Sequence, residues 1–372
     1  MKRGWYKRMQ AWMYLGLMLS FSTQVTAEPL PYTVEEVASG LEIPWGVAFV
    51  NPNTVLITER SGTAKLLSIE SRTLRPLTGL PEVYAEGQGG LLDVAIPPPG
   101  EADGWLYFTY SKPIVSAAAT TLARAQLEGS QLVDWQDLLV TQSVTNTSYH
   151  FGSRIAFDGA GHLFFTVGDR GVRPNGQDTS NHAATVLRLN LDGSVPKDNP
   201  FVGGTEALPE IWSYGHRNPQ GIALDQQNRL WAIEHGPRGG DELNQLLPGR
   251  NYGWPVISYG KEYWGPIAVG EGTHREGMEQ PVKYYVPSIA PGSLIAYSGK
   301  AFPQWKGDLF AGALKLRHIN RIGVNGAGEA VEEERLLTEL DERIRALVES
   351  PEGWIYFTTD SGKVFRVRPE TD

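Results

Sequence analysis

The chain has 372 residues, no cysteine and a formal net charge of −9 at pH 7. The lack of cysteine excludes disulfides, thiolate metal sites and a cysteine nucleophile, and the acidic balance argues against a nucleic-acid partner. The 11 Trp and 15 Tyr residues are expected mainly to pack the core.

The first 27 residues carry the pattern of a secretory signal peptide. Four basic residues open the chain: Lys2, Arg3, Lys7 and Arg8. An apolar run follows from Met9 to about Ser22, and Val25-Thr26-Ala27 fits a small-residue cleavage site. Since a membrane span needs about 20 apolar residues, we expect cleavage rather than membrane insertion, with a mature catalytic domain at residues 28–372. A secreted chain without disulfides suits a bacterial periplasm.

Six short stretches then repeat one pattern. Each begins with Gly or Asn, places an aliphatic residue two positions later and follows it with a large apolar residue. They span residues 53–62, 104–112, 161–169, 228–236, 307–315 and 353–362. A turn residue before a short β-branched or aromatic run predicts a strand, and recurrence at intervals of roughly 45–80 residues is typical of a propeller.

A partner strand is predicted before each repeat. These partners span residues 46–50, 91–96, 153–158, 220–225, 294–299 and 345–350. Five of them carry Ala between two apolar residues, which suits a crowded inner strand near an axis, whereas the last has Ala346-Leu347-Val348. Turn residues such as Asp158-Gly159 predict that each pair is an antiparallel hairpin.

Further strands complete the blades. Outer strands are predicted at residues 64–70, 121–129, 185–193 and 363–369. The stretch around Tyr32–Leu41 is expected to pair into the last blade and close the ring, which removes exposed sheet edges. The prediction is therefore an all-β chain, a six-bladed β-propeller of four-stranded antiparallel blades.

The hairpins also predict where polar residues meet. Residues just before an inner strand and just after the second strand should lie at one rim of the central channel, because the two strands are antiparallel. The sequence places there Gln88, His150, Asp169, Arg217, Asn218, Gly236, Pro237, Asp241, Glu242, Lys315, Arg343 and Arg345. An open rim of this kind is where ring-shaped folds bind ligands.

These residue types indicate an anionic ligand and a hard cation. Arg and Lys bind carboxylates through charge-assisted hydrogen bonds. The Gly-rich segment 234–242 combines backbone carbonyls with carboxylates, which suits Ca²⁺ although EF-hand spacing is missing. His150 could serve as a general base. No P-loop, G-x-S-x-G or strand-linked G-x-G-x-x-G is evident, so nucleotide chemistry is not expected.

Each of these residues also has an ordinary structural interpretation. His150 could cap a loop, and Arg217 could brace a turn through blade carbonyls. Arg343 and Arg345 alternate with Ile344, as on any half-exposed strand, and Asp241-Glu242 could be solvated loop carboxylates. Only the joint placement of the side chains favours a binding site.

Several segments resemble the glucose/sorbosone dehydrogenase family, and within it the soluble aldose sugar dehydrogenases that depend on pyrroloquinoline quinone (PQQ). The matching segments are residues 87–95, 150–171, 186–201, 215–223, 234–244 and 249–255. The resemblance implies a six-bladed propeller with PQQ and Ca²⁺ at the channel mouth. It also implies oxidation of the C1 hydroxyl of aldoses to lactones by hydride transfer to PQQ C5, broad sugar specificity and an external electron acceptor.

The resemblance implies roles for individual residues. His150 is the implied proton acceptor, and Arg217 is expected to add positive charge beside the reacting oxygen. The implied PQQ contacts are Gln88, Arg217, Asn218, Lys315, Arg343 and Arg345. The carbonyls of Gly236 and Pro237 match ligands of a catalytic Ca²⁺, and Glu242 and the Tyr252 carbonyl match a second, structural Ca²⁺ site. Tyr263 is expected to pack near the cofactor.

The sequence departs from the soluble glucose dehydrogenases of this family at two places. Tyr149 stands where they have Asp before the catalytic His, so Asp169 becomes the candidate for orienting the imidazole. Val286-Pro287 stands where they have Trp-Pro, so glucose preference is not implied. A Ca²⁺-dependent, lactonase-type hydrolase and a non-catalytic glycan-binding propeller remain as alternatives.

Overall fold

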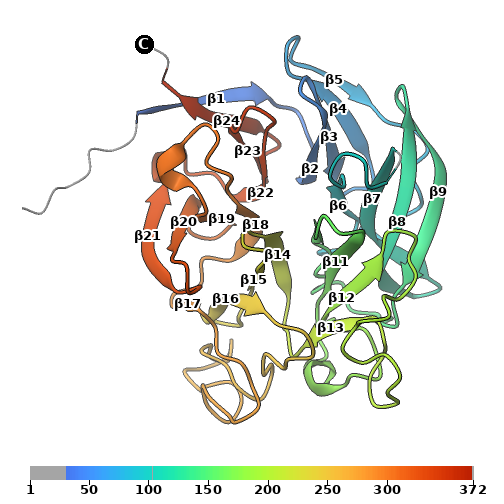
Figure 1. Cartoon of the computed structure of the whole chain (residues 1–372), viewed down its shortest axis with the longest axis vertical. Helices are drawn as coiled ribbons and strands as arrows, with labels where there is room; N and C mark the ends of the chain where they lie inside the picture. The colour runs from blue at the N-terminus through green and yellow to red at the C-terminus, as the bar shows by residue number, and fades with distance from the viewer. Residues whose placement is uncertain (1–30, 103, 371–372) are drawn as a thin grey trace, which may run out of the picture. The chain divides into compact units, whose positions relative to one another are not determined.

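The computed structural model describes residues 31–102 and 104–370. The predicted signal peptide at residues 1–27 lies outside these described residues. From Tyr32 onward the chain forms six four-stranded antiparallel sheets that follow one another around a central channel (Figure 1). The helical elements of the described part are three short 3-10 helices, Arg173–Gln177, Pro303–Trp305 and Thr338–Leu340, and no helix there is long and apolar enough to cross a membrane. The predicted all-β, six-bladed propeller is confirmed.

The blades have the following strands. Blade 1 contains β2 (Pro44–Asn51), β3 (Thr54–Glu59), β4 (Ala64–Ser68) and β5 (Thr73–Pro76). Blade 2 contains β6 (Leu91–Ala95), β7 (Trp105–Ile114), β8 (Ala117–Glu128) and β9 (Gln131–Val140). Blade 3 contains β10 (Ile155–Phe157), β11 (His162–Val167), β12 (Thr185–Asn190) and β13 (Ile211–Tyr214). Blade 4 contains β14 (Pro219–Leu224), β15 (Leu230–Glu234), β16 (Asp241–Leu246) and β17 (Lys283–Tyr285). Blade 5 contains β18 (Pro291–Ala296), β19 (Leu309–Ala313), β20 (His318–Val324) and β21 (Ala330–Leu336). Blade 6 contains β22 (Ile344–Glu349), β23 (Ile355–Thr359), β24 (Val364–Pro369) and β1 (Tyr32–Ala38).

All six predicted inner strands and all six repeat strands are present, and each pair is antiparallel. The N-terminal strand closes the ring as predicted, with Tyr32 opposite Pro369 and Val34 opposite Val367. The strands predicted at the outside prove to be third strands, because β5, β9, β13, β17 and β21 lie beyond the third strands of their blades. In blade 6 the predicted 363–369 strand is likewise third, and β1 lies outside it.

The blades are joined by a recurring threonine near the end of the second strand. Thr109 Oγ1 donates to the Ser153 carbonyl at 2.6 Å, Thr166 Oγ1 to the Pro219 carbonyl at 2.9 Å, and Thr358 Oγ1 to the Pro44 carbonyl at 2.9 Å. Each acceptor lies at or just before the inner strand of the next blade. Buried carbonyls need hydrogen-bond donors. The threonine hydroxyls therefore hold each blade in a fixed position along the channel axis relative to the inner strand of the next blade.

The apolar core lies between adjacent blades rather than within one sheet. One cluster joins blades 1 and 2, and others join blades 2 and 3, 3 and 4, 4 and 5, and 6 and 1. Inner strands approach closely where glycine removes a side chain: a Cβ on Gly46 would lie 2.7 Å from the Val94 nitrogen, and one on Gly221 would lie 2.6 Å from the Leu294 nitrogen. Gly46 and Gly221 therefore allow the inner strands of neighbouring blades to approach closely near the axis.

Candidate active site

The structure brings most of the predicted rim residues together at one mouth of the channel. A cavity of about 330 Å³ there is lined by Gln88, Asn218, Arg343 and Arg345. His150 adjoins this cavity, since its backbone N–H donates to Gln88 Oε1 at 2.8 Å. The hairpin pattern alone predicts that these residues lie at the rim. The antiparallel pairing of inner and second strands therefore explains why they come together.

His150 is held by a carboxylate. It sits in a left-handed backbone conformation, with φ of 58°, and its Nδ1 lies 2.6 Å from Asp169 Oδ1. Burial lowers the pKa of His150, the Asp169 hydrogen bond opposes this, and the Arg217 charge lowers the pKa further. The imidazole is therefore neutral near pH 7. Its Nδ1–H points to Asp169, which leaves Nε2 as the acceptor.

Asp169 is anchored from three directions. Its Oδ1 also accepts from the Gly171 N–H at 2.7 Å, its Oδ2 accepts from Trp254 Nε1 at 2.8 Å, and its own N–H donates to the Arg217 carbonyl at 2.8 Å. Burial would raise the pKa of Asp169, but the hydrogen bond with His150, the Arg217 charge and the hydrogen bond from the Gly171 N–H hold that pKa below its usual value. Asp169, which the sequence suggests as the residue that orients His150, thus contacts the imidazole. Trp254, which the sequence shows only as part of the family segment 249–255, holds the second carboxylate oxygen of Asp169.

Arg217 both braces a loop and faces the site. Its Nη1 donates to the carbonyls of His235 and Gly236 at 3.2 and 3.0 Å, as in the turn-bracing interpretation. Its Nη2 lies 3.4 Å from Tyr263 Oη, and its guanidinium lies 5.4 Å from the Trp254 ring centre. Tyr263 is 64% exposed. It therefore touches the site only at its margin.

Arg343 and Arg345 share one acceptor that the sequence reasoning missed. Asp360 accepts from Nε of both arginines at 2.8 Å, and Arg343 Nη1 donates to the Leu314 carbonyl at 3.0 Å. Asp360 directly follows β23, the second strand of its blade, just as Asp169 comes shortly after β11. Residues in this position are expected at the rim of the channel, so the same reasoning predicts Asp360. Because one carboxylate faces two guanidinium groups, this wall of the cavity keeps a net positive charge. Lys315 is exposed, and its ammonium has no hydrogen bond to a described residue.

The Gly-rich loop after β15 is organised by Asp241. This fully buried carboxylate accepts from the Gly236 N–H at 3.0 Å, from Ser288 Oγ at 2.7 Å and from the Ala290 N–H at 2.8 Å. Asp241 is thereby committed to the loop rather than to a ligand. Pro237 is buried against Gly260, where a Cβ would lie 2.6 Å from the proline ring. A larger side chain at position 260 would therefore collide with Pro237, so the loop conformation depends on this glycine.

Two carboxylates lie beside this loop, the buried Glu234 and the partly buried Glu242. Burial and the neighbouring Glu234 charge raise the pKa of Glu242 well above its usual value. Glu234 itself accepts from the Arg217 N–H at 2.6 Å and pairs with His216 Nδ1 at 2.9 Å. A cavity of about 10 Å³, lined in part by Glu234, Glu242 and Tyr252, separates the groups. Asn244, whose amide N–H reaches both carboxylates at 3.3 and 3.4 Å, leaves its buried Oδ1 without a hydrogen-bond partner.

These features fit a bound cation. The raised pKa of Glu242 next to a second carboxylate and the amide oxygen of Asn244 without a partner are both features that a hard cation would compensate. The space is of the order of one water or ion. Within residues 31–102 and 104–370, no group of three or more His, Asp or Glu side chains could hold a metal. Backbone carbonyls would therefore have to supply part of the coordination, as expected for Gly236, Pro237 and Tyr252.

Comparison with known proteins identifies the family of this chain. The sequence model of the glucose/sorbosone dehydrogenase family matches residues 41–366. The aldose sugar dehydrogenase YliI of Escherichia coli K12 is 38% identical over 364 residues, which cover 96% of this chain and 98% of that protein.

Solved structures give the same result. The soluble aldose sugar dehydrogenase of Escherichia coli in its apo form superposes with a TM-score of 0.87 at 37% identity, over 91% of this chain and 100% of that one. The PQQ-bound aldose sugar dehydrogenase of Streptomyces coelicolor has a TM-score of 0.74 at 25% identity, over 92% and 99% of the two chains. The chain therefore belongs to the glucose/sorbosone dehydrogenase family of oxidoreductases.

Proposed function

We propose that this protein oxidises the C1 hydroxyl of aldose sugars to the corresponding lactones, with PQQ and Ca²⁺ at the channel mouth and with broad sugar specificity. The observation that carries the proposal is the neutral His150, held 2.6 Å from Asp169 beside a positively charged cavity. A hydrolase of the lactonase type could use a rim histidine and Ca²⁺, but it has no need for several arginines around that histidine.

His150 is the proposed general base. The Asp169 carboxylate fixes the tautomer with Nδ1–H directed to it, so Nε2 is free to take the proton of the C1 hydroxyl. The same carboxylate stabilises the imidazolium that results. Arg217, whose carbonyl accepts from the Asp169 N–H at 2.8 Å, would place a fixed positive charge near the oxygen that gains charge, as expected for electrostatic stabilisation.

The cavity fits a polyanionic planar cofactor. PQQ carries three carboxylates, and the cavity offers the guanidinium groups of Arg343 and Arg345 and the amides of Gln88 and Asn218. Lys315, which directly follows the lining residue Leu314, is proposed as a further cofactor contact. The PQQ-bound relative from Streptomyces coelicolor supports the same cofactor here. The chemistry supplied by bound PQQ would be a hydride acceptor, its C5 carbonyl carbon, and bound Ca²⁺ would polarise that same carbonyl as a Lewis acid.

Two proposed Ca²⁺ positions differ in their ligands. The carbonyls of Gly236 and Pro237 would serve the catalytic ion beside Arg217. Glu242 and the Tyr252 carbonyl would serve the structural ion, where Asn244 Oδ1 lacks a partner. The reduced cofactor would pass its electrons to an acceptor outside the chain, which the residues do not identify.

We also propose that the mature protein is periplasmic. The basic and apolar pattern of residues 1–27 supports export and cleavage near Glu28. Mass spectrometry of the protein recovered from a periplasmic fraction tests this, because cleavage there gives a chain that begins at or near residue 28.

The proposed activity is tested by loading the purified protein with PQQ and Ca²⁺ and supplying an aldose with a redox dye. We expect dye reduction that requires both additions. Lactone hydrolysis without PQQ would instead support the hydrolase, and glycan binding with no turnover would support the binding module. His150→Ala should lower kcat by at least about 10²-fold, the lower range for loss of a general base.

A further inference from the structure

One arginine joins all six blades at the axis of the ring. Arg154 precedes β10 in blade 3 and is 6% exposed. Its guanidinium reaches the other five blades through the Trp45 ring at 3.9 Å, Asp93 Oδ1 at 2.9 Å and the carbonyls of Gln220, Gly292 and Arg345 at 3.0, 2.5 and 3.0 Å. No sequence argument above had singled it out.

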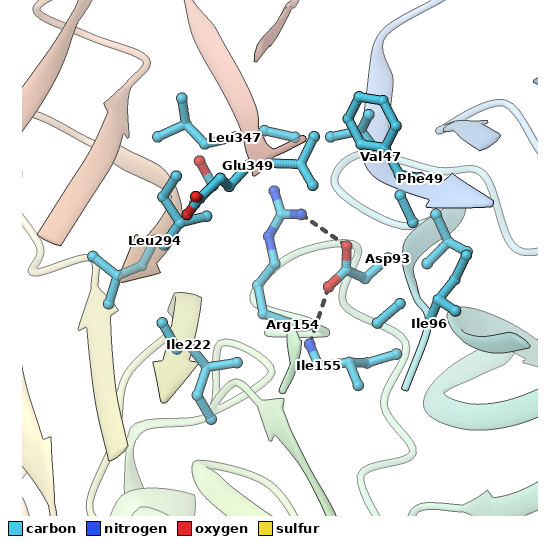
Figure 2. Close-up of a pocket in the computed structure, with 18 of the residues that line it drawn as sticks. Val47, Phe49, Asp93, Ile96, Arg154, Ile155, Ile222, Leu294, Leu347 and Glu349 are labelled. Atoms are coloured by element: carbon cyan, nitrogen blue, oxygen red, sulfur yellow. Dashed lines mark hydrogen bonds and ion pairs between the residues drawn. The ribbon is translucent and has the colours of Figure 1, made fainter. Parts of the chain in front are cut away.

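Arg154 divides the channel into two cavities. On one side lies the catalytic cavity of about 330 Å³, and on the other lies a cavity of about 410 Å³ with mostly apolar walls. The two cavities share no lining residue. Figure 2 shows the second cavity, with Arg154 and Asp93 at its centre and apolar side chains such as Ile222, Leu294 and Leu347 around them. Asp93 Oδ2 also accepts from the Ile155 N–H at 3.0 Å, so the pair is fixed to the backbone.

The groups that Arg154 touches form the floor of the catalytic cavity. Trp45, Gln220 and Arg345 all line that cavity. Gln220 Nε2 in turn donates to the Gly152 carbonyl at 2.9 Å and lies 3.4 Å from Asn218 Oδ1, which accepts from the Gly152 N–H at 3.1 Å. Gly152 is two residues from His150. A continuous set of hydrogen bonds therefore links the axis to the predicted cofactor contacts and to the base.

Overall stability alone does not explain a charged pair at this place. Removing two charges from water costs several kcal/mol per ion, and well-packed apolar residues often replace a buried ion pair without loss of stability. What an apolar residue could not supply is a planar set of donors that satisfies three carbonyls from three blades at once. The geometry of Arg154 thus points to positioning.

We propose that Arg154 is a positioning residue for the catalytic mouth: it fixes the inner strands of six blades at one spacing and thereby sets the floor on which the anionic cofactor lies. Its relevance to catalysis rests on the proposed PQQ-dependent function. The role of Arg154 in arranging the cavity floor is independent of that proposed function.

The test compares two buried ion pairs of similar exposure. Arg154→Met combined with Asp93→Asn removes the axial pair without leaving an unpaired charge. The control is Arg321→Met combined with Asp308→Asn, because Arg321 is 7% exposed and pairs with Asp308 at 2.5 Å away from the channel. Its two other partners, Glu332 and Glu334, are solvent-exposed carboxylates that water can hydrate when the arginine is removed. PQQ binding to the apo-protein with Ca²⁺ is followed by quenching of tryptophan fluorescence. Hydrogen exchange of peptides covering residues 148–153 and 215–221 is followed in the absence of cofactor.

We expect the axial variant to bind PQQ about tenfold more weakly or worse and to exchange faster in both peptides, while the control binds and exchanges there as wild type does. If the double variant does not fold, Arg154→Lys replaces it, since lysine keeps the charge but loses the planar donors. Equal affinity and equal exchange in the axial variant would overturn the inference, and so would the same losses in the control. A wild type that fails to bind PQQ would refute the proposed function, and the exchange data would still decide the role of Arg154.

Discussion

At the scale of single residues, the site depends on how His150 is oriented. Tyr149, the residue before it, packs against His150 in a T-shaped arrangement with ring centres 5.2 Å apart and provides no carboxylate. Asp169 supplies that carboxylate from the loop after β11, and Trp254 fixes its other oxygen. The sequence could suggest Asp169 from its place after a strand. It could not reveal Trp254, because that contact joins positions 85 residues apart.

Asp169→Asn tests this orientation. The amide can present its NH₂ to Nδ1, which favours the wrong tautomer, so we expect kcat to fall by about 10²-fold or more. Because the same NH₂ then faces the Gly171 N–H, which loses its acceptor, we also expect a lower melting temperature. The matched control is Asp158→Asn, because Asp158 pairs with His162 Nδ1 at 2.7 Å in a hairpin away from the mouth. Comparable loss of turnover in both variants would contradict the assigned role of Asp169.

The pH dependence follows from the same group. The base must be neutral, and burial lowers the folded-state pKa of His150. Activity should therefore persist below pH 6.5, the ordinary histidine value, and fall only as the pH drops through the lowered pKa. A profile of kcat/KM against pH measures this. An acid limb above pH 6.5 would be inconsistent with the buried imidazole as base.

At the scale of elements, the second strands hold the ring through their threonines. Thr358→Val should leave the Pro44 carbonyl without its 2.9 Å partner and lower the free energy of unfolding by about 1–3 kcal/mol. Thr205→Val, at an exposed loop position, should change it by less than about 0.5 kcal/mol. Urea unfolding of both variants checks the difference.

The Gly-rich loop and β16 give a second prediction at this scale. Ca²⁺ should raise the melting temperature of the wild type, because it binds the folded state alone and offsets the Glu242 and Glu234 charges. Glu242→Gln should abolish most of that rise, whereas Glu279→Gln, whose carboxylate pairs with Arg250 at 3.6 Å, should keep it. An undiminished Ca²⁺ response in Glu242→Gln would remove this residue from the proposed site.

Strand prediction succeeded where burial was strong. The inner and second strands have apolar residues on both faces, so their pattern is visible in the sequence. The fourth strands are blade edges, and all except β1 were not predicted. In β21, Glu332, Glu333 and Glu334 are exposed, so a pattern of buried residues cannot detect such a strand. The role of Arg154 is not visible in the sequence for a different reason: its partners come from five other blades and come together only in the closed ring.

At the scale of the whole molecule, closure by β1 is the feature that makes the mouth a fixed site. A chain that begins at Gly40 lacks the six residue pairs between β1 and β24 and exposes the β24 edge, so we expect aggregation or a large drop in melting temperature. A chain that begins at Glu28 keeps β1 and should behave as the full mature protein. Light scattering and thermal unfolding distinguish the two outcomes.

The central claim is that the charged mouth binds PQQ together with Ca²⁺. The most direct measurement is a PQQ titration of the purified apo-protein with and without Ca²⁺, followed by addition of an aldose and a redox dye. The account predicts saturable binding at one equivalent per chain that requires Ca²⁺, and sugar-dependent dye reduction by the complex. The absence of saturable binding when Ca²⁺ is supplied would contradict it.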